Sequence, residues 1–453
     1  MCPKRAHAIY ANRYSQYFLT NKIYLIMRKL NFLVTVVCVF ILGSCSKNDD
    51  TLKNYHLITV DQAIEIAKEN RNTSIIDEKK LSQRGDDFIL LNTFTLDDEN
   101  NIPSLYIINY KIGGNEFFNI ISADSRLDNV LAYGERTIQQ SDIVEGLSVW
   151  INEQIRLIQE IRNRNLTKYE VLTDIIQARV LPKDKTNCCE ECPNYPDCLI
   201  FPWLGCGEPD INCEYDPCEG ISIYISVGPL MTSRWGQGCD YNADCPIRGC
   251  NQLPCGSTRA LTGCVATAMS QIIRHHAFPA GYDYNNMLND YTALRADGNP
   301  ANDPTPAQVE AVARLMRDAG NEVDMVYGCN ISTAFTCDEV PGAMTGFFNY
   351  TTTNNCQNYS TASFNIIRND IDHNRPLLFR GNGHAWVCDG YRVIKYCAEV
   401  ELPSGGQGII VYAPRYYLYM NWGRNGFGNG FFDYSAANGG FESQEQFINN
   451  INP

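Results

Sequence analysis

The chain has 453 residues, a length that accommodates two or three domains with hydrophobic cores of their own. Its formal net charge is −14, and an acidic protein is poorly suited to nucleic acid, whose phosphates are bound by clustered Lys and Arg side chains. We therefore expect no nucleic-acid partner.

The cysteines indicate the compartment. All of the 20 cysteines except Cys2, Cys38 and Cys45 lie between Cys188 and Cys397. Such a density is typical of a disulfide-bonded protein in an oxidising environment. Their number in this stretch, seventeen, is odd, so at least one thiol has no partner within the chain.

Residues 1–44 have the pattern of an export leader. Basic residues at Arg28 and Lys29 precede an apolar core from 30 to 42, which is too short to span a bilayer comfortably. The core ends in Leu-Gly-Ser-Cys45, which looks like a bacterial lipobox. We predict that Cys45 is lipidated, that residues 45–57 tether the chain to a membrane, and that the protein is an outer-membrane or cell-surface lipoprotein whose mature part can be released. The alternative is an ordinary signal peptide with a chance cysteine.

Residues 58–182 are predicted to form a small α/β domain. Helical periodicity is present at 59–67 and 141–164, and strand-like runs cover 104–110 and 116–122. The only histidine near this part, His56, precedes it and is isolated. A domain without chemistry of its own, placed before a catalytic one, suggests a folding aid or a propeptide that maintains latency; the alternative is a plain structural domain.

Residues 183–220 form a connector that is rich in Cys, Pro, Asp and Gly. The pair Cys189 and Cys192 has a zinc-like spacing, but no histidine lies nearby. Disulfides are the more consistent interpretation for a secreted chain. We expect no metal here.

Residues 221–453 are predicted to form the catalytic domain. Helices are expected at 264–276 and 306–319, and strands at 376–380, 385–393, 408–413 and 416–421. Together they form an α/β pattern that ends in strands.

Within this domain, Cys264 begins an apolar run that lasts to Ile273 with the spacing of a buried helix. The free backbone N–H groups and the dipole at a helix N-terminus favour an anion. With a histidine partner, a cysteine there can have its pKa lowered from about 8.5 to roughly 3–4. Cys264 is therefore the candidate nucleophile.

A nucleophilic cysteine needs a base, and four histidines lie downstream of it. His275 and His276 stand at the far end of the same helix, about 16–18 Å along its axis, too far to act. His373 lies in a polar stretch that is expected to be solvated. His384 begins a strand after glycines, which allow a close approach of another segment, so His384 is the open partner.

Asn421 and Trp422 follow a strand and precede glycine-rich turns. An Asn side chain can accept the N–H of a catalytic histidine while a Trp shields that bond from water. The alternative is a glycine-rich hairpin with a packed Trp. Another rival concerns the thiol: strand alternation puts Cys388 on the face of His384, but a strand offers no dipole to ionise it.

The motifs around these residues, in this order, resemble the streptopain family of papain-like cysteine peptidases: Trp235-Gly-Gln237-Gly, Gly263-Cys264-Val-Ala-Thr-Ala-Met-Ser-Gln-Ile, Gly383-His384-Ala-Trp-Val, Asn421-Trp422-Gly and Asn429-Gly-Phe-Phe. The amino half is similar to the propeptides of the family at 118–126 and 130–135. An insertion that carries Cys397 makes the stretch between His384 and Asn421 longer than the usual hairpin of the family.

The resemblance implies a papain-like domain of α+β class behind a small α/β propeptide, with cleavage between about residues 181 and 229. It implies Cys264 as nucleophile and His384 as base and later acid. Gln237 would stabilise the oxyanion with the backbone N–H of Cys264, and Asn421 with Trp422 would orient and cover the imidazole. No metal or cofactor is implied.

The sequence thus predicts a secreted cysteine endopeptidase that is made as a latent zymogen. Its partners would be protein or peptide substrates, its own propeptide as an intramolecular inhibitor, and a membrane through the lipid on Cys45. Two alternatives are kept: a catalytically silent surface binding protein or adhesin on a papain-like scaffold, and a transferase acting on glutamine or amine groups.

Overall fold

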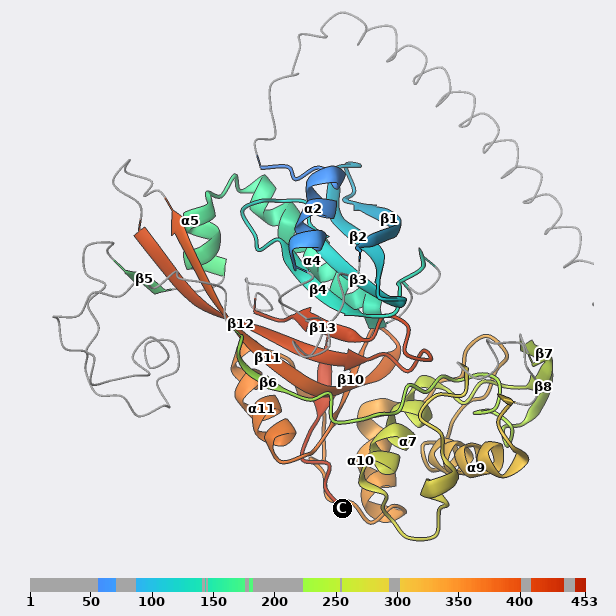
Figure 1. Cartoon of the computed structure of the whole chain (residues 1–453). Coiled ribbons are helices and arrows are strands. Elements are labelled where there is room, and N and C mark those ends of the chain that lie inside the picture. Colours follow the sequence, from blue (N-terminus) through green and yellow to red (C-terminus); the bar gives the residue numbers. More distant parts are fainter. Residues whose placement is uncertain are drawn as a thin grey trace, which may run out of the picture. The chain divides into compact units, whose positions relative to one another are not determined.

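The computed structural model describes residues 56–70, 87–140, 143, 146–175, 179–181, 223–252, 255–292, 302–400, 409–435 and 445–453. The predicted leader at 1–44, the lipidation site Cys45 and the connector at 183–220 lie outside the described residues. Residues His56–Pro453 form one compact unit (Figure 1).

The amino-terminal part of this unit is a four-stranded antiparallel sheet with two main helices. Its elements are α2 (Val60–Asn70), β1 (Ile89–Asp97), β2 (Pro103–Ile112), β3 (Asn115–Ser122), β4 (Val130–Glu135), α4 (Gly146–Asn163), the short α5 (Lys168–Glu170) with the π-helical turn η2 (Val171–Ile175), and β5 (Arg179–Leu181). The helix predicted from 59 starts at Val60 because Thr59 and Gln62 exchange hydrogen bonds at its start. The helix predicted from residue 141 begins at Gly146, and its buried face includes Leu147, Trp150 and Ile158.

The carboxyl-terminal part has a helical half and a sheet half. Its helices are α7 (Cys264–His276), α9 (Pro306–Glu322), α10 (Thr336–Gly346) and α11 (Phe364–Asp372), with single turns at η5 (Tyr284–Asn286) and η7 (Thr361–Ser363). The first two correspond to the predicted helices. Helix α9 starts at a capping box in which Thr305 and Gln308 bond to each other's backbone. Helices α7, α9 and α10 pack together (Figure 1).

The strands of this part are β6 (Ile223–Val227), β7 (Ile247–Gln252), β8 (Ser257–Arg259), β9 (Gln357–Asn358), β10 (Leu377–Gly381), β11 (His384–Val400), β12 (Ile409–Asn421), β13 (Gly430–Asp433) and β14 (Gln446–Ile448). All of them except β7 and β8 join the amino-terminal strands in one antiparallel sheet, in the order β1-β2-β3-β4-β13-β12-β11-β10-β14-β9, with β5 paired to β12 and β6 to β11. Strands β7 and β8 form a separate hairpin.

Strand β12 is continuous where the sequence predicts two strands separated at Pro414. Proline has no backbone N–H and normally interrupts a strand that is bonded on both sides. Here Pro414 pairs with Lys395 of β11, while on the other side of β12 the partner strands β5 and β13 bond to 410–412 and 417–420. Pro414 lies between them, so its missing donor leaves no ladder bond unmade. The insertion with Cys397 is an extension of the same hairpin.

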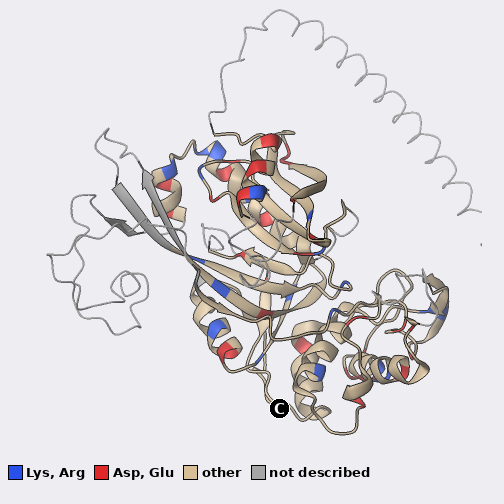
Figure 2. Ribbon diagram, in the orientation of Figure 1, with Lys and Arg blue, Asp and Glu red and all other residues tan. Residues whose placement is uncertain are grey.

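The two predicted domains share a sheet and a core. Strand β4 pairs with β13, with Ala132 opposite Phe432 and Gly134 opposite Gly430. One buried cluster contains side chains from both parts, including Phe118 and Trp150 from the first and Trp386, Trp422 and Phe432 from the second. The predicted α+β class is confirmed. No helix of the described ranges has the length and apolarity to cross a membrane. In those ranges, Lys and Arg are interleaved with Asp and Glu, as on α2 and α4 (Figure 2).

Candidate active site

Cys264 is the first residue of α7, as the sequence predicts. The helix behind it is buried from Cys264 to Ile273, which explains the long uncharged run. Its N-cap residue, Gly263, has no side chain that could occupy the free N–H groups of the first turn. The Cys264 thiol is not in a disulfide, and the residue is 8% exposed. An ionisable sulfur therefore lies at the positive end of a helix dipole.

Gly263 is required by both conformation and space. Its φ of 89° lies in the region that L-residues with a side chain rarely adopt. A Cβ atom at this position would lie 2.6 Å from Sδ of Met325. Thr267 then locks the turn, because its hydroxyl donates to the carbonyl of Gly263.

The residues just before Cys264 are held from two sides. The N–H of Thr262 donates to the carbonyl of Gln237 at 3.0 Å, which fixes the predicted oxyanion residue beside the nucleophile. On the other side, the N–H of Leu261 donates to the carbonyl of Gly328, and the hydroxyl of Ser332 donates to the carbonyl of Leu261. Gln237 and the 328–332 loop thus flank the approach to Cys264.

His384 is the first residue of β11 and is buried. Helix α7 packs on β11, and Cys264 belongs to the same buried cluster as Ala385, the neighbour of His384. The Nε2 atom of His384 lies 3.0 Å from the carbonyl oxygen of Trp422. A carbonyl oxygen can only accept, so Nε2 carries the proton and Nδ1 of the neutral ring is the basic nitrogen.

Trp422 provides this carbonyl from a rigid turn. Its backbone N–H donates to Oδ1 of Asn429, and its indole N–H donates to the carbonyl of Gly428. The ring of His384 stacks on Trp386 at 6.0 Å, and Trp386 lies against Trp422 at 5.1 Å. The ring that stacks on the imidazole is thus Trp386, and Trp422, the residue expected to cover it, lies behind Trp386.

The Asn421 side chain is engaged away from the imidazole. Its Nδ2 donates to the carbonyl of Ser233 at 2.8 Å and to Oε1 of Gln271 at 3.2 Å. Its Oδ1 accepts from the N–H of Gly423. In this structure the orienting contact expected from Asn421 is made instead by the carbonyl of Trp422.

Gln271 is a residue of the site that the sequence analysis missed. It is fully buried in α7, and its Oε1 also accepts from the backbone N–H of Trp235, two residues before Gln237. One amide side chain therefore joins the nucleophile helix, the Gln237 segment and the turn of Asn421. The available signal was a single amide in an otherwise apolar run, since a buried amide must be paired.

The amino-terminal part lies directly on His384. A Cβ atom on Gly146, the first residue of α4, would be 2.7 Å from Cδ2 of His384 and 2.9 Å from Trp386. Further along the interface, Arg234 bonds to Glu135 at 2.5 Å, and Arg136 forms an ion pair with Asp290. The start of α4 therefore covers the imidazole.

The other free thiols of the described residues are poor nucleophiles. Cys388 is fully buried on β11, and burial raises the pKa of its thiol well above the usual value. Burial likewise raises the pKa of the Cys245 thiol to about 12. Trp386 and Cys388 share one buried cluster, whereas Ala385 and Val387 lie in the other, as the predicted alternation requires.

The remaining histidines lie away from this site. His275 and His276 end α7, where His275 bonds to Asn374. Burial lowers the pKa of His276 to about 4. His373 is exposed at the end of α11.

Comparisons with known proteins show which families the chain resembles. Residues 235–432 match the model of the peptidase C10 family, and residues 55–156 match that of the Spi protease inhibitors. The chain is 25% identical to streptopain of Streptococcus pyogenes over 423 residues, which cover 83% of this chain and 87% of streptopain. It is 28% identical over 273 residues to the thiol protease/hemagglutinin PrtT of Porphyromonas gingivalis, which cover 50% of this chain and only 28% of PrtT.

A solved structure has the same fold. A prointerpain A fragment of Prevotella intermedia superposes with a TM-score of 0.50 at 20% identity, over 82% of this chain and 99% of the fragment. The predicted resemblance to the streptopain family, with a propeptide-like domain ahead of the catalytic one, is confirmed.

Proposed function

We propose, from the match of residues 235–432 to the model of the peptidase C10 family and from the similarity to streptopain, that this chain is a cysteine endopeptidase made as a latent precursor. The observation that carries the proposal is the free thiol of Cys264 at the uncapped start of a buried helix that packs on the strand of His384. Proteins or peptides are the substrates, and no cofactor takes part.

In the first step Nδ1 of His384 removes the thiol proton, and the Cys264 sulfur attacks the scissile carbonyl carbon. The bond from Nε2–H to the carbonyl of Trp422 keeps Nδ1 as the basic nitrogen and stabilises the imidazolium that forms. The helix dipole stabilises the thiolate before the attack.

The tetrahedral intermediate carries a negative oxygen. The backbone N–H of Cys264 and the side chain of Gln237 are its donors, a type of contribution that is worth about 10²–10³ in kcat for a single donor. The imidazolium then protonates the leaving amine, which leaves a thioester on Cys264. Water attacks the thioester with His384 again as base, and the free thiol is restored.

Latency follows from the position of α4. Because Gly146 contacts the imidazole ring itself, a peptide cannot occupy that space until the amino-terminal domain moves or is cut away. Cleavage between about residues 181 and 229 would release it. The finer location is also a proposal: lipid on Cys45 anchors the precursor at the outer membrane or cell surface, and mass spectrometry of the secreted protein would detect the lipid and the new N-terminus.

The test is Cys264→Ala in the full chain. Peptide hydrolysis and self-processing should both disappear, while the far-UV circular dichroism and melting temperature stay unchanged. An epoxide-type thiol inhibitor should label the matured wild type at Cys264. Retained thiol-dependent hydrolysis in Cys264→Ala would overturn the assignment, and the absence of labelling would favour a binding protein on the same scaffold.

A further inference from the structure

The hairpin of β7 and β8 contributes almost nothing to a hydrophobic core. In β7 only Cys250 is buried, and Ile247 is 68% exposed. The two strands form a sheet of their own, and an isolated two-stranded hairpin is marginally stable. What the hairpin does contribute is two disulfides to the segments that flank Cys264.

The first disulfide reaches the Gln237 segment. Cys239, two residues after Gln237, is bonded to Cys255 at the turn of the hairpin. The carbonyl of Gln237 accepts the N–H of Thr262, two residues before Cys264. One end of the disulfide therefore lies two residues along the chain from a residue that is bonded next to Cys264. The disulfide therefore limits the motion of the segment that carries the proposed oxyanion donor.

The second disulfide reaches the opposite flank. Cys250 of β7 is bonded to Cys329, the residue after Gly328, whose carbonyl accepts the N–H of Leu261. The segment continues through two exposed apolar side chains, Val326 and Ile331. These two side chains give this flank an exposed apolar surface.

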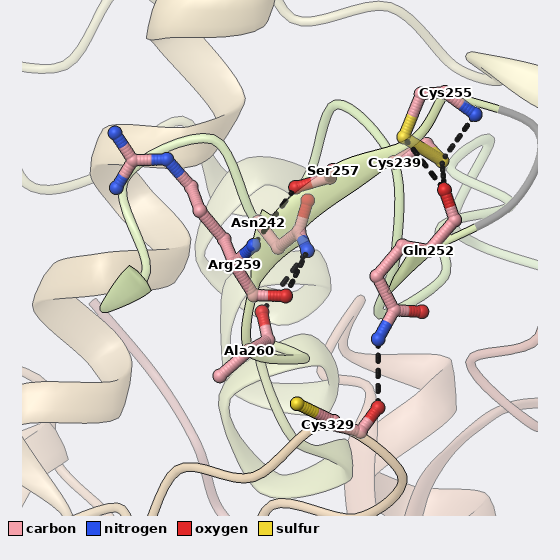
Figure 3. The surroundings of a disulfide bond; sticks show 8 residues. All are labelled: Cys239, Asn242, Gln252, Cys255, Ser257, Arg259, Ala260 and Cys329. Carbon is pink, nitrogen blue, oxygen red and sulfur yellow. Dashed lines mark hydrogen bonds between the residues drawn. A yellow bond between two sulfur atoms is a disulfide. The ribbon is translucent and has the colours of Figure 1, made fainter. Parts of the chain in front are cut away.

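Gln252 joins the two disulfides. Its side-chain Nε2 donates to the carbonyl of Cys329 at 2.7 Å (Figure 3). Its backbone carbonyl oxygen contacts the sulfurs of Cys239 and Cys255. The hairpin, both cystines and both flanks are thus one connected unit.

We propose that the β7–β8 hairpin is a disulfide clasp that positions Gln237 and the 325–333 segment on the two sides of Cys264. The inference rests on the proposed peptidase function. The two cystines act through other residues: Cys239–Cys255 positions the oxyanion donor and so affects kcat, whereas Cys250–Cys329 positions a substrate-contacting wall and so affects KM.

The experiment compares double-alanine variants of the full chain after self-processing. Cys239→Ala with Cys255→Ala should lower kcat by about 10–100-fold with KM nearly unchanged, because a displacement of about 1 Å at a catalytic group costs up to roughly 10²-fold. Cys250→Ala with Cys329→Ala should raise KM severalfold with a smaller change in kcat. Gln252→Leu keeps both disulfides but removes the bond to the carbonyl of Cys329, so it should also raise KM.

The chain offers a matched control in Cys337→Ala with Cys356→Ala. This disulfide spans 19 residues, close to the 16 of Cys239–Cys255, so its removal has a similar entropic effect on the unfolded chain. It joins the start of α10 to the segment before β9, and in the described part of the chain neither Cys337 nor Cys356 is bonded to Gln237 or Leu261. The kcat and KM of this variant should stay within about twofold of wild type. Its melting temperature should fall by about as much as that of Cys239→Ala with Cys255→Ala.

A double-mutant cycle separates positioning from general stability. In the background of Gln237→Ala, removal of Cys239–Cys255 should cost no further kcat, because the group it positions is gone. The clasp is rejected if removal of Cys239–Cys255 lowers kcat as much in the Gln237→Ala background as in the wild type. It is also rejected if both flank variants behave like the control. A wild-type chain that neither hydrolyses peptides nor reacts at Cys264 rejects the peptidase function itself, and the clasp with it.

Discussion

Gly146 and His384 lie so close that a Cβ atom on Gly146 would be 2.7 Å from the imidazole, although 238 positions of sequence separate the two residues. Gly146 starts the longest helix of the amino-terminal part, and His384 starts the strand that presents the proposed base. The proposed latency is therefore a steric relationship at the imidazole ring.

Gly146→Ala is expected to accelerate self-processing. The new methyl group would lie 2.7 Å from the His384 ring and 3.1 Å from Trp422, so rings on the enzyme side must shift. Overpacking of this kind costs about 1–3 kcal/mol, which exceeds the gain of up to about 1 kcal/mol that Ala has over Gly in a helix. The rate of maturation on gels should rise roughly fivefold or more.

The control for this change is Asn152→Ala, on the exposed side of the same helix. It should mature at the wild-type rate. Slower maturation of Gly146→Ala than of Asn152→Ala would show that α4 is not seated on the imidazole.

Gln271→Leu is expected to damage stability and catalysis together. The substitution removes the acceptor of the Trp235 N–H and one partner of the Asn421 amide, all buried. An unsatisfied buried polar group costs about 1–3 kcal/mol, so we expect a loss of roughly 3 kcal/mol in the free energy of unfolding. Urea denaturation and kcat measure the two effects.

Ser270→Ala is the matched control for Gln271→Leu. Ser270 is equally buried in α7, and its hydroxyl has no hydrogen-bond partner in the described part of the chain. Its removal should be nearly neutral. A kcat of Gln271→Leu equal to that of Ser270→Ala would contradict the proposed link between the two active-site segments.

Asp389 predicts a pH dependence of stability. Its Oδ2 accepts the N–H of Met231, and its carbonyl accepts that of Leu230, so it fastens this segment to β11. Burial raises the pKa of the carboxyl group to about 7, against the opposing effect of these hydrogen bonds. An acid whose pKa is raised on folding contributes stability that is full below about pH 4, the unfolded pKa, and is lost as the pH rises through the folded pKa.

Asp389→Asn keeps an acceptor for Met231 and does not titrate. Its free energy of unfolding, minus that of the wild type, should rise by up to about 1.4 kcal/mol per pH unit between pH 4 and 7 and then level off. Urea denaturation in a Cys264→Ala background, where no processing occurs, measures this difference. A difference that does not change with pH would rule out a titrating Asp389.

Cys388→Ala tests the rival thiol. The side chain is fully buried, and burial raises its pKa, so it should supply no nucleophile. We expect unchanged kcat and unchanged labelling by the thiol inhibitor, with a loss of about 1 kcal/mol in stability from the small cavity. Loss of labelling in this variant, with Cys264 intact, would move the nucleophile to Cys388.

The part of the site that is local in sequence could be predicted. The start of α7 at Cys264 follows from an uninterrupted apolar run after a glycine, and the face shared by Trp386 and Cys388 follows from strand alternation. The continuity of β12 through Pro414 could not, because it depends on where two other strands end.

Contacts between distant segments could not be predicted from the sequence either. Two neighbouring residues, Asn421 and Trp422, each offer an acceptor for Nε2 of His384. The conformation of their turn decides that the backbone carbonyl of Trp422 makes this bond and not the side chain of Asn421. Sequence motifs name both residues but do not say which atom makes the bond. The same holds for Gln271, whose partners come from two other segments.

The pairing of β4 with β13 has a consequence for the mature protein. If the proposed cleavage removes the first 180 or so residues, the backbone of Gly430–Phe432 loses the strand to which it is now hydrogen-bonded. An uncovered border of this kind invites another extended chain. The proposed activation would thus uncover the catalytic centre and at the same time expose an edge strand, β13. An extended polypeptide of any sequence would find main-chain hydrogen-bonding groups along that edge.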